Sequence, residues 1–190
     1  MPSLRKPSPE KLRAFLATQA RLDFTYEAVG ATAAVPPAGY VVDHTRIRLG
    51  DGPAVFAAAR AALRRWEHFR LGWVETWPPG LPIEAGQVAA VIARSAGLWW
   101  MNACRILSVV NEADQFGFTY GTLPGHAESG EERFRIERDR SDAVSYDILA
   151  FSRPRHILAR IGRSWTRRVQ KRFARDSAAA MLRAVGQIPV

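Results

Sequence analysis

Seven runs of apolar, aromatic and β-branched residues follow one another between Tyr40 and Ser152. In most of them apolar and polar positions alternate, as in strands with one buried face. Short segments containing Gly, Pro, Asp or Asn separate most of the runs. Because strands joined by short turns are antiparallel neighbours, the pattern predicts an antiparallel sheet with one face to bury. The predicted strands are residues 40–50, 72–77, 87–97, 98–111, 116–123, 131–138 and 143–152.

Two segments before and between these strands carry the signals of helices. Residues 8–24 open with Ser8 as N-cap and Pro9 at the first helical position, so a short helix is predicted there. Residues 54–69 are alanine-rich and amphipathic, and Asp51 is placed to cap the helix that they form.

A long C-terminal helix is predicted from Pro154 to about Val185. Apolar residues recur on it at spacings of three and four, which forms one stripe along the helix. The stripe matches the face that the sheet has to bury, so the helix is expected to lie against the sheet. It consists of Leu158, Ile161, Trp165, Val169 and Phe173.

The order of elements favours an α+β fold, with a curved antiparallel sheet of about seven strands wrapped around the C-terminal helix. We expect a single domain over residues 1–190, with an N-terminal helical extension (1–25) and a helix-grip-like core (26–186). The order is similar to the helix-grip fold of the birch-pollen-allergen and START-like superfamily. That resemblance implies a cavity between sheet and helix, of the kind that often holds an apolar small molecule.

Four segments resemble the signature segments of an uncharacterised family, domain of unknown function 1990, also called uncharacterised protein family 0548. They are TYEAVGAT (25–32), GYVVDHTRIRLGDG (39–52), FGFTYGTLPGHAESGEERF (116–134) and AFSRP (150–154). The resemblance runs from about Tyr26 to the terminal helix. It implies a single-domain intracellular protein and brings no known activity.

The segment 117–134 contains the polar groups that a functional site would use. Alternation places Glu132 on the same face as core residues and Glu131 on the opposite, outward face. A carboxylate that faces the interior needs a hydrogen-bond partner, or its pKa rises. Tyr120, His126 or an arginine of the terminal helix is the expected partner.

Several interpretations of this segment stay open. The polar groups orient a ligand at the mouth of the cavity, or Glu132 or His126 serves as an acid/base catalyst, or the segment is an ordinary hairpin with a structural hydrogen bond. One histidine with two loop carboxylates, Glu128 and Glu131, is a weak signal for a metal, so no metal site is predicted. The sequence does not identify a cofactor. The expected ligand-binding residues are Tyr120, Thr122, His126, Glu131, Glu132 and Trp165.

The excess positive charge, a formal net charge of +9, lies in the C-terminal segment. From Arg153 to Arg183 there are ten Lys/Arg residues and one acid, Asp176, while the rest of the chain has 17 basic and 17 acidic residues. A basic amphipathic helix can dock on an anionic membrane or an acidic partner, or it can present a solvated face. The basic residues proposed for this face are Arg160, Arg163, Arg167, Arg168, Lys171, Arg172 and Arg175.

Composition narrows the choice of function. One cysteine, Cys104, excludes an internal disulfide and a multi-cysteine zinc site. The N-terminus lacks the apolar run of a signal peptide and no stretch approaches the roughly 20 apolar residues of a membrane span, so a cytoplasmic protein is expected. No nucleic-acid-binding motif accompanies the basic helix, so a nucleic-acid partner is not expected. The preferred function is binding of a small, largely apolar molecule.

Overall fold

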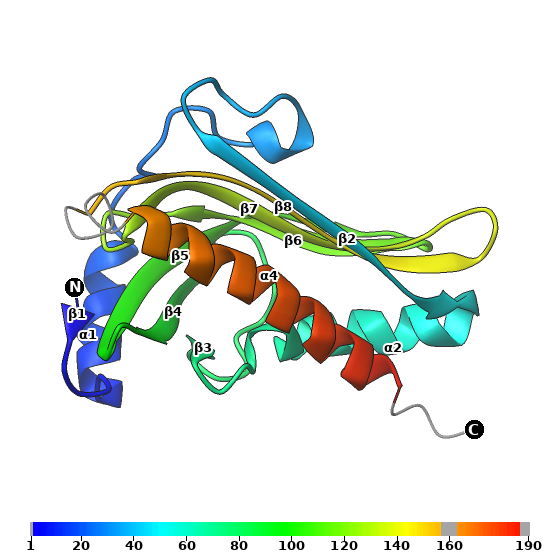
Figure 1. Cartoon of the computed structure of the whole chain (residues 1–190), viewed down its shortest axis with the longest axis horizontal. Helices are drawn as coiled ribbons and strands as arrows, with labels where there is room; N and C mark the ends of the chain where they lie inside the picture. Colours follow the sequence, from blue (N-terminus) through cyan, green and yellow to red (C-terminus); the bar gives the residue numbers. More distant parts are fainter. Residues whose placement is uncertain (1, 157–162, 187–190) are drawn as a thin grey trace.

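The structure, a computed structural model of the chain, describes residues 2–156 and 163–186 (Figure 1). Two short 3-10 helices, η1 and η2, accompany the strands and α-helices, and neither was predicted from the sequence. In chain order the elements are β1 (Pro2–Ser3), α1 (Pro9–Gln19), η1 (Ala31–Ala33), β2 (Val41–Asp51), α2 (Gly52–Arg64), η2 (Glu67–Phe69), β3 (Val74–Trp77), β4 (Val88–Ser95), β5 (Leu98–Asn111), β6 (Gln115–Thr122), β7 (Glu128–Arg138), β8 (Ala143–Pro154) and α4 (Arg163–Val185).

The strands form one antiparallel sheet in the order β2-β8-β7-β6-β5-β4-β3, with the two-residue β1 paired to β5. Register shifts interrupt β2 near Arg48 and β5 near Ile106, and such bulges increase the bend of a strand. The curved sheet wraps around α4, as Figure 1 shows. The predicted helix-grip-like α+β fold is therefore confirmed.

The larger core lies on the concave face of the sheet, under α2, η2 and α4. Phe118, Phe134 and Tyr146 point from neighbouring strands into this core and are almost fully buried. Phe69 of η2 packs on Phe134, with ring centroids 5.6 Å apart, and Met181 of α4 closes the cluster. Burial of these large side chains provides most of the driving force for this arrangement.

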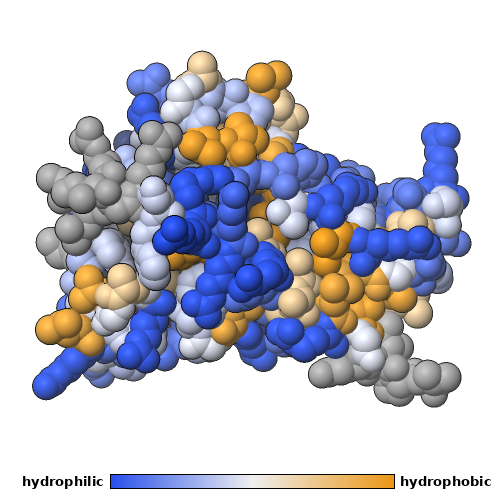
Figure 2. All heavy atoms as spheres, in the orientation of Figure 1, coloured by the Kyte–Doolittle hydropathy of each residue, from blue (hydrophilic) through white to orange (hydrophobic). Residues whose placement is uncertain are grey.

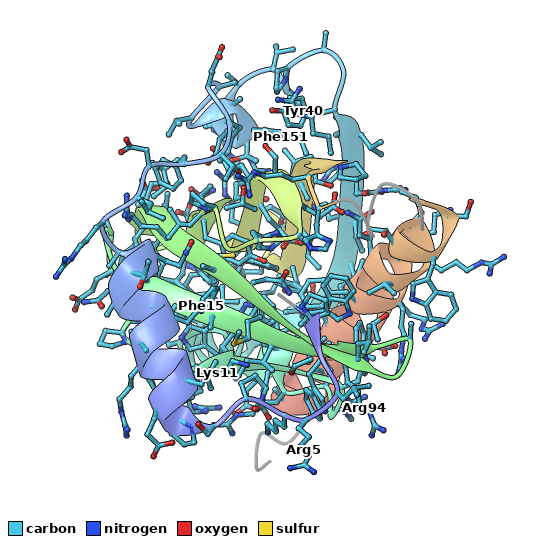
Figure 3. The ribbon with its side chains drawn as sticks, turned by 90° about the vertical axis from the view of Figure 1, so that its left-hand side faces the viewer. Arg5, Lys11, Phe15, Tyr40, Arg94 and Phe151 are labelled. Atoms are coloured by element: carbon cyan, nitrogen blue, oxygen red, sulfur yellow. The ribbon has the colours of Figure 1, made fainter. Side chains whose placement is uncertain are left out.

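A second, smaller core lies on the opposite face of the sheet, so the expectation that the sheet buries one face was wrong. Leu12 and Leu16 of α1 pack there against Ile92, Met101 and Leu123. Figure 3 looks at this end of the molecule, with α1 beside the strands and Phe15 among the packed side chains. The N-terminal segment thus covers apolar positions that alternation alone would leave exposed.

Helix α1 begins as predicted, because the Ser8 side chain accepts a hydrogen bond from the Lys11 N–H at 3.3 Å. The expected cap on α2 was wrong. Asp51 occupies the N-cap position but its side chain makes no capping hydrogen bond. Its carboxylate instead accepts a hydrogen bond from Arg48 at 2.5 Å, so the ion pair has replaced the cap.

The apolar stripe on α4 faces the sheet in part. Phe173 packs against Phe69, with ring centroids 4.9 Å apart, and Val169 is half-buried. The placement of Trp165 against the sheet was wrong: it is 49% exposed and its indole N–H donates to Ser95 Oγ at 2.8 Å. At this end of α4 the neighbour is the β4–β5 turn, which leaves the ring uncovered. Leu158 and Ile161 lie outside the described residues.

Candidate functional site

A cavity of about 390 Å³ lies between the sheet and α4. Its wall is formed by side chains from β2, β3, β4, β6, β7, β8, η2 and α4, so the site depends on the whole fold. Most of the wall is apolar. The apolar side chains of the wall include Phe69, Trp73, Val91, Ile148, Val169 and Phe173.

The polar part of the wall includes Tyr120 and Glu132, which are paired across β6 and β7. The Tyr120 hydroxyl donates to Glu132 Oε2 at 2.5 Å. Burial raises the pKa of Glu132 to about 7, and the hydrogen bond from Tyr120 opposes that rise. Burial and the neighbouring Glu132 charge raise the pKa of Tyr120 as well. The structure thus brings together two of the predicted site residues.

Glu128 is a second carboxyl group on the same wall. It shares an inward face of β7 with Glu132, because the two residues are separated by an even number of positions. It is 9% exposed, and its Oε1 has no hydrogen-bond partner among the described residues. Burial raises the pKa of Glu128 to about 7, against a hydrogen bond from Ser152 and the charge of Arg167.

His126 occupies the turn before β7. Its Nδ1 accepts the Glu128 backbone N–H at 2.9 Å, so the neutral ring carries its proton on Nε2. Burial lowers the pKa of His126 to about 4, which keeps the ring neutral at pH 7. The expected polar cluster with Tyr120 and Glu132 is not formed among the contacts of the described residues. The tight turn directs Nδ1 back to its own backbone instead.

His126 also borders a second cavity of about 300 Å³, on the α1 side of the molecule. Phe15 and Gln19 of α1 line this space, and the Gln19 side-chain oxygen accepts the Gly125 N–H at 2.6 Å. Helix α1 therefore helps to fix the turn that carries His126.

Glu131 was expected to face outward into solvent, and this was wrong. Its side chain lies on the opposite face from Glu132, yet it is only 2% exposed. The segment around Tyr26, Gly30 and Thr32 covers it, and both carboxylate oxygens accept hydrogen bonds from that segment. Although Glu131 borders the cavity, its carboxylate is fully occupied by these structural contacts.

The same covering segment explains two other features near the site. Thr122 was expected to contact a ligand and does border the cavity, but its hydroxyl lies 2.6 Å from Thr25 Oγ1 and accepts the Gly130 N–H. At Gly121, an added Cβ would lie 2.1 Å from the Tyr26 hydroxyl. Glycine at this position therefore lets the covering segment approach β6. Figure 3 shows Phe151 with Tyr40 above it, at the edge of this region.

Trp165 does not border the 390 Å³ cavity, although it was expected to contact a ligand. Its indole is held at Ser95, outside the wall. Trp73 of the loop before β3 supplies a tryptophan in its place. The Trp73 N–H donates to Asp176 at 3.0 Å, and the Arg172 guanidinium lies 4.3 Å from its ring centroid.

Fewer basic residues of α4 are free to bind an anionic membrane or an acidic partner than the charge count suggested. Arg167 was expected on the solvated face, but its two guanidinium nitrogens bind the two carboxylate oxygens of Asp43 on β2. Arg172 and Arg175 both bind Asp176. Arg168 and Lys171 are exposed, and Figure 2 shows a largely polar surface over α4.

Two of the predicted basic residues are described in part or not at all. Arg160 lies outside the described residues, and of Arg163 the helical backbone is described.

Within residues 2–156 and 163–186, no group of three His, Cys, Asp or Glu side chains is arranged to hold a metal. The three residues considered for a metal do not converge, because the Glu131 carboxylate is bound to the covering segment. No described helix is both long and apolar enough to cross a membrane. Cys104 is buried in the core, and burial raises the pKa of its thiol.

Comparison with known proteins decides the family. The domain of unknown function DUF1990 matches residues 25–180. The chain belongs to the DUF1990 family. It is 34% identical to a UPF0548 protein of Dictyostelium discoideum, over 96% of this chain and 94% of that protein. A UPF0548 protein of Deinococcus radiodurans is 35% identical, over 96% of this chain and 98% of that protein.

A solved structure of a hypothetical protein from Helicobacter pylori shares the fold of this DUF1990 member. The TM-score is 0.51 at 7% identity, over 84% of this chain and 94% of that one. At this identity the likeness concerns the fold alone.

Sequence reasoning overlooked Glu128 as a wall residue. The strand was predicted to begin at Glu131, which left Glu128 in a loop where alternation does not apply. In the structure β7 begins at Glu128, and the even spacing to Glu132 was the signal that could have revealed it. Gly130, between them, hid that signal because glycine usually interrupts strands.

Proposed function

We propose that the protein binds a small, largely apolar molecule in the cavity between the sheet and α4. The observation that carries this proposal is the cavity itself, which at about 390 Å³ falls within the range of small-molecule sites, roughly 300–1,000 Å³. Phe69, Trp73 and Phe173 offer an aromatic surface to the body of a ligand. A few polar groups on an apolar wall are typical of sites that fix ligand orientation.

Two features support a binding role over a purely structural one. The first is that the cavity is concave and lined mostly by apolar side chains, as small-molecule sites are. In addition, Glu128 and Glu132 place carboxyl groups on the wall of this space, where burial disfavours their charged forms. A bound molecule would fill the void and supply polar partners.

The proposal can be tested with a substitution on α4 that fills the cavity. Ala174 borders the cavity, so Ala174→Phe places a ring in it. Ala57→Phe, at an exposed position of α2, makes the same change in size away from the cavity. Wild type and Ala57→Phe are expected to bind N-phenyl-1-naphthylamine, an uncharged apolar fluorophore, and Ala174→Phe is expected to lose that binding. Equal binding by all three proteins would contradict the proposal.

A second candidate function is acid/base catalysis on a ligand held in the same cavity. Glu132 favours it, because a carboxyl group with a pKa of about 7 can both accept and donate a proton near neutral pH. The test is to incubate the molecule that co-purifies with the protein and to follow it by mass spectrometry. Catalysis predicts a new product with wild type and none with Glu132→Gln, whereas an unchanged molecule in both samples would exclude it.

A further inference from the structure

The polar wall of the cavity offers acceptors that no protein group uses. Glu128 Oε1 is buried and without a hydrogen-bond partner in the described part of the chain. Glu132 receives one hydrogen bond, from Tyr120, at its Oε2. The Glu128 oxygen left in this state costs free energy, because its lone pairs have lost their water. Glu128 Oε1 therefore lacks a donor among the described residues.

The nearby cations of α4 do not supply this donor. Arg167 acts on Glu128 through its charge, but its guanidinium is bound to Asp43. Arg175 is exposed and bound to Asp176. Lys171 borders the cavity from an exposed position on α4. Within the described residues, neither Glu128 nor Glu132 takes part in an ion pair.

We propose that the cavity selects an amphiphile with a primary ammonium head and an apolar body, and that the ammonium binds the carboxyl group of Glu128. An ammonium brings three N–H donors and a positive charge, so it satisfies the acceptor and stabilises the carboxylate form. The apolar body then lies along Phe69, Trp73 and Phe173. This inference rests on the proposed function and adds the chemical class of the ligand.

Other head groups fit the wall less well. A carboxylate or phosphate head would bring further acceptors beside Glu128 and Glu132, and like charges in a desolvated space repel strongly. A single hydroxyl supplies one donor and no charge. The surface cation Lys171 could attract an anionic head to the mouth of the cavity, so an anionic probe belongs in the test.

The experiment compares three probes with the same chain by isothermal titration calorimetry at pH 7.5: decylamine, decanol and decanoate. Decylamine is expected to bind wild type at least tenfold more tightly than decanol, because a charge-assisted hydrogen bond is stronger than a neutral one. Glu128→Gln is expected to lose this preference and to keep its affinity for decanol. Glu112→Gln removes the same charge at an exposed position away from the cavity and should behave as wild type.

The outcomes separate this inference from the proposed function. Decanol or decanoate binding as tightly as decylamine would overturn the amine preference and leave ligand binding standing. A preference that survives in Glu128→Gln would overturn the assigned role of Glu128. Absence of binding by all three probes would overturn both. The wild-type comparison is decisive even if Glu128→Gln does not fold.

Discussion

Glu131 holds Thr32, 99 positions earlier in the chain, through two hydrogen bonds to one oxygen. The Thr32 N–H donates to Glu131 Oε1 at 2.9 Å and the Thr32 hydroxyl donates to it at 2.5 Å. Tyr26 and Gly30 donate to the other oxygen at 3.0 and 2.7 Å. One buried carboxylate thus joins the segments 25–32 and 116–134, which carry the resemblance to the DUF1990 family, and it fixes β7 behind the cavity.

Replacing this carboxylate should destabilise the fold. Glu131→Gln introduces an amide NH₂ where one oxygen accepted two hydrogen bonds, so buried donors lose their acceptor. We expect the free energy of unfolding in urea to fall by about 2–4 kcal/mol. Glu27→Gln changes an exposed carboxylate of the covering segment and should cost less than about 0.5 kcal/mol. Equal stability of the two variants would show that the four hydrogen bonds contribute nothing.

Glu132 should make stability depend on pH in a defined window. Its pKa is about 7 in the folded protein against an ordinary value of 4.5, so the folded state keeps a proton that the unfolded state releases between these values. Stability contributed by this group is therefore present below pH 4.5 and is lost as pH rises toward 7. The loss is at most about 3 kcal/mol, at about 1.4 kcal/mol per pH unit.

The measurement is the difference in unfolding free energy between wild type and Glu132→Gln across this window. Asp43 and Tyr120 act on the same carboxyl group and are present in both proteins, so the difference isolates Glu132. As pH rises from 4.5 to 7, the unfolding free energy of wild type should fall relative to that of Glu132→Gln. A constant difference would mean that the group titrates with an ordinary pKa.

His68 should destabilise the fold as pH falls, whereas Glu132 destabilises it as pH rises. The ring is fully buried among Trp66, Phe69 and Phe134, and neither nitrogen has a hydrogen-bond partner within the described residues. Burial lowers its pKa from 6.5 to about 3, so the unfolded state takes up a proton first as pH falls. His68→Phe should remove up to about 1.4 kcal/mol per pH unit of destabilisation between pH 6.5 and 3. Parallel pH profiles of the two proteins would show that the ring is not buried in its neutral form.

The ion pair between Arg167 and Asp43 should connect α4 to β2. Both side chains are about one third exposed, so the pair contributes modestly despite its two-point geometry. A double-mutant cycle with Arg167→Gln and Asp43→Asn is expected to give a coupling energy of about 0.5–1 kcal/mol that decreases with added salt. The exposed neighbour Arg168, changed to Gln, should show no coupling with Asp43.

Much of the fold could be predicted because strands and helices follow local patterns. Alternation placed Glu132 inside, and the short turns required antiparallel neighbours. The burial of Glu131 could not be predicted in the same way, since alternation gives the face of a residue and not what covers that face. The cover comes from Tyr26 and Thr32, about 100 positions away in the chain.

The candidate site was less predictable because it depends on where elements begin and meet. Glu128 belongs to the wall because β7 begins three residues earlier than expected. His126 turns back to its own backbone, which depends on the geometry of the turn. Trp165 continues the apolar stripe of α4 in sequence, but its indole N–H binds Ser95 at the end of β4 and its side chain stays about half exposed. The outcomes for His126 and Trp165 do not follow from a local pattern, and the outcome for Glu128 follows from alternation only once the start of β7 is known.

The cavity between the sheet and α4 is proposed to hold a small molecule in the native protein. Native mass spectrometry of the purified chain tests it most directly, with Ala174→Phe and Ala57→Phe prepared in parallel. An additional non-covalent mass is expected on wild type and Ala57→Phe, and it should disappear on denaturation and be missing from Ala174→Phe. Bare protein in every sample, both as purified and after incubation with N-phenyl-1-naphthylamine, would contradict the claim.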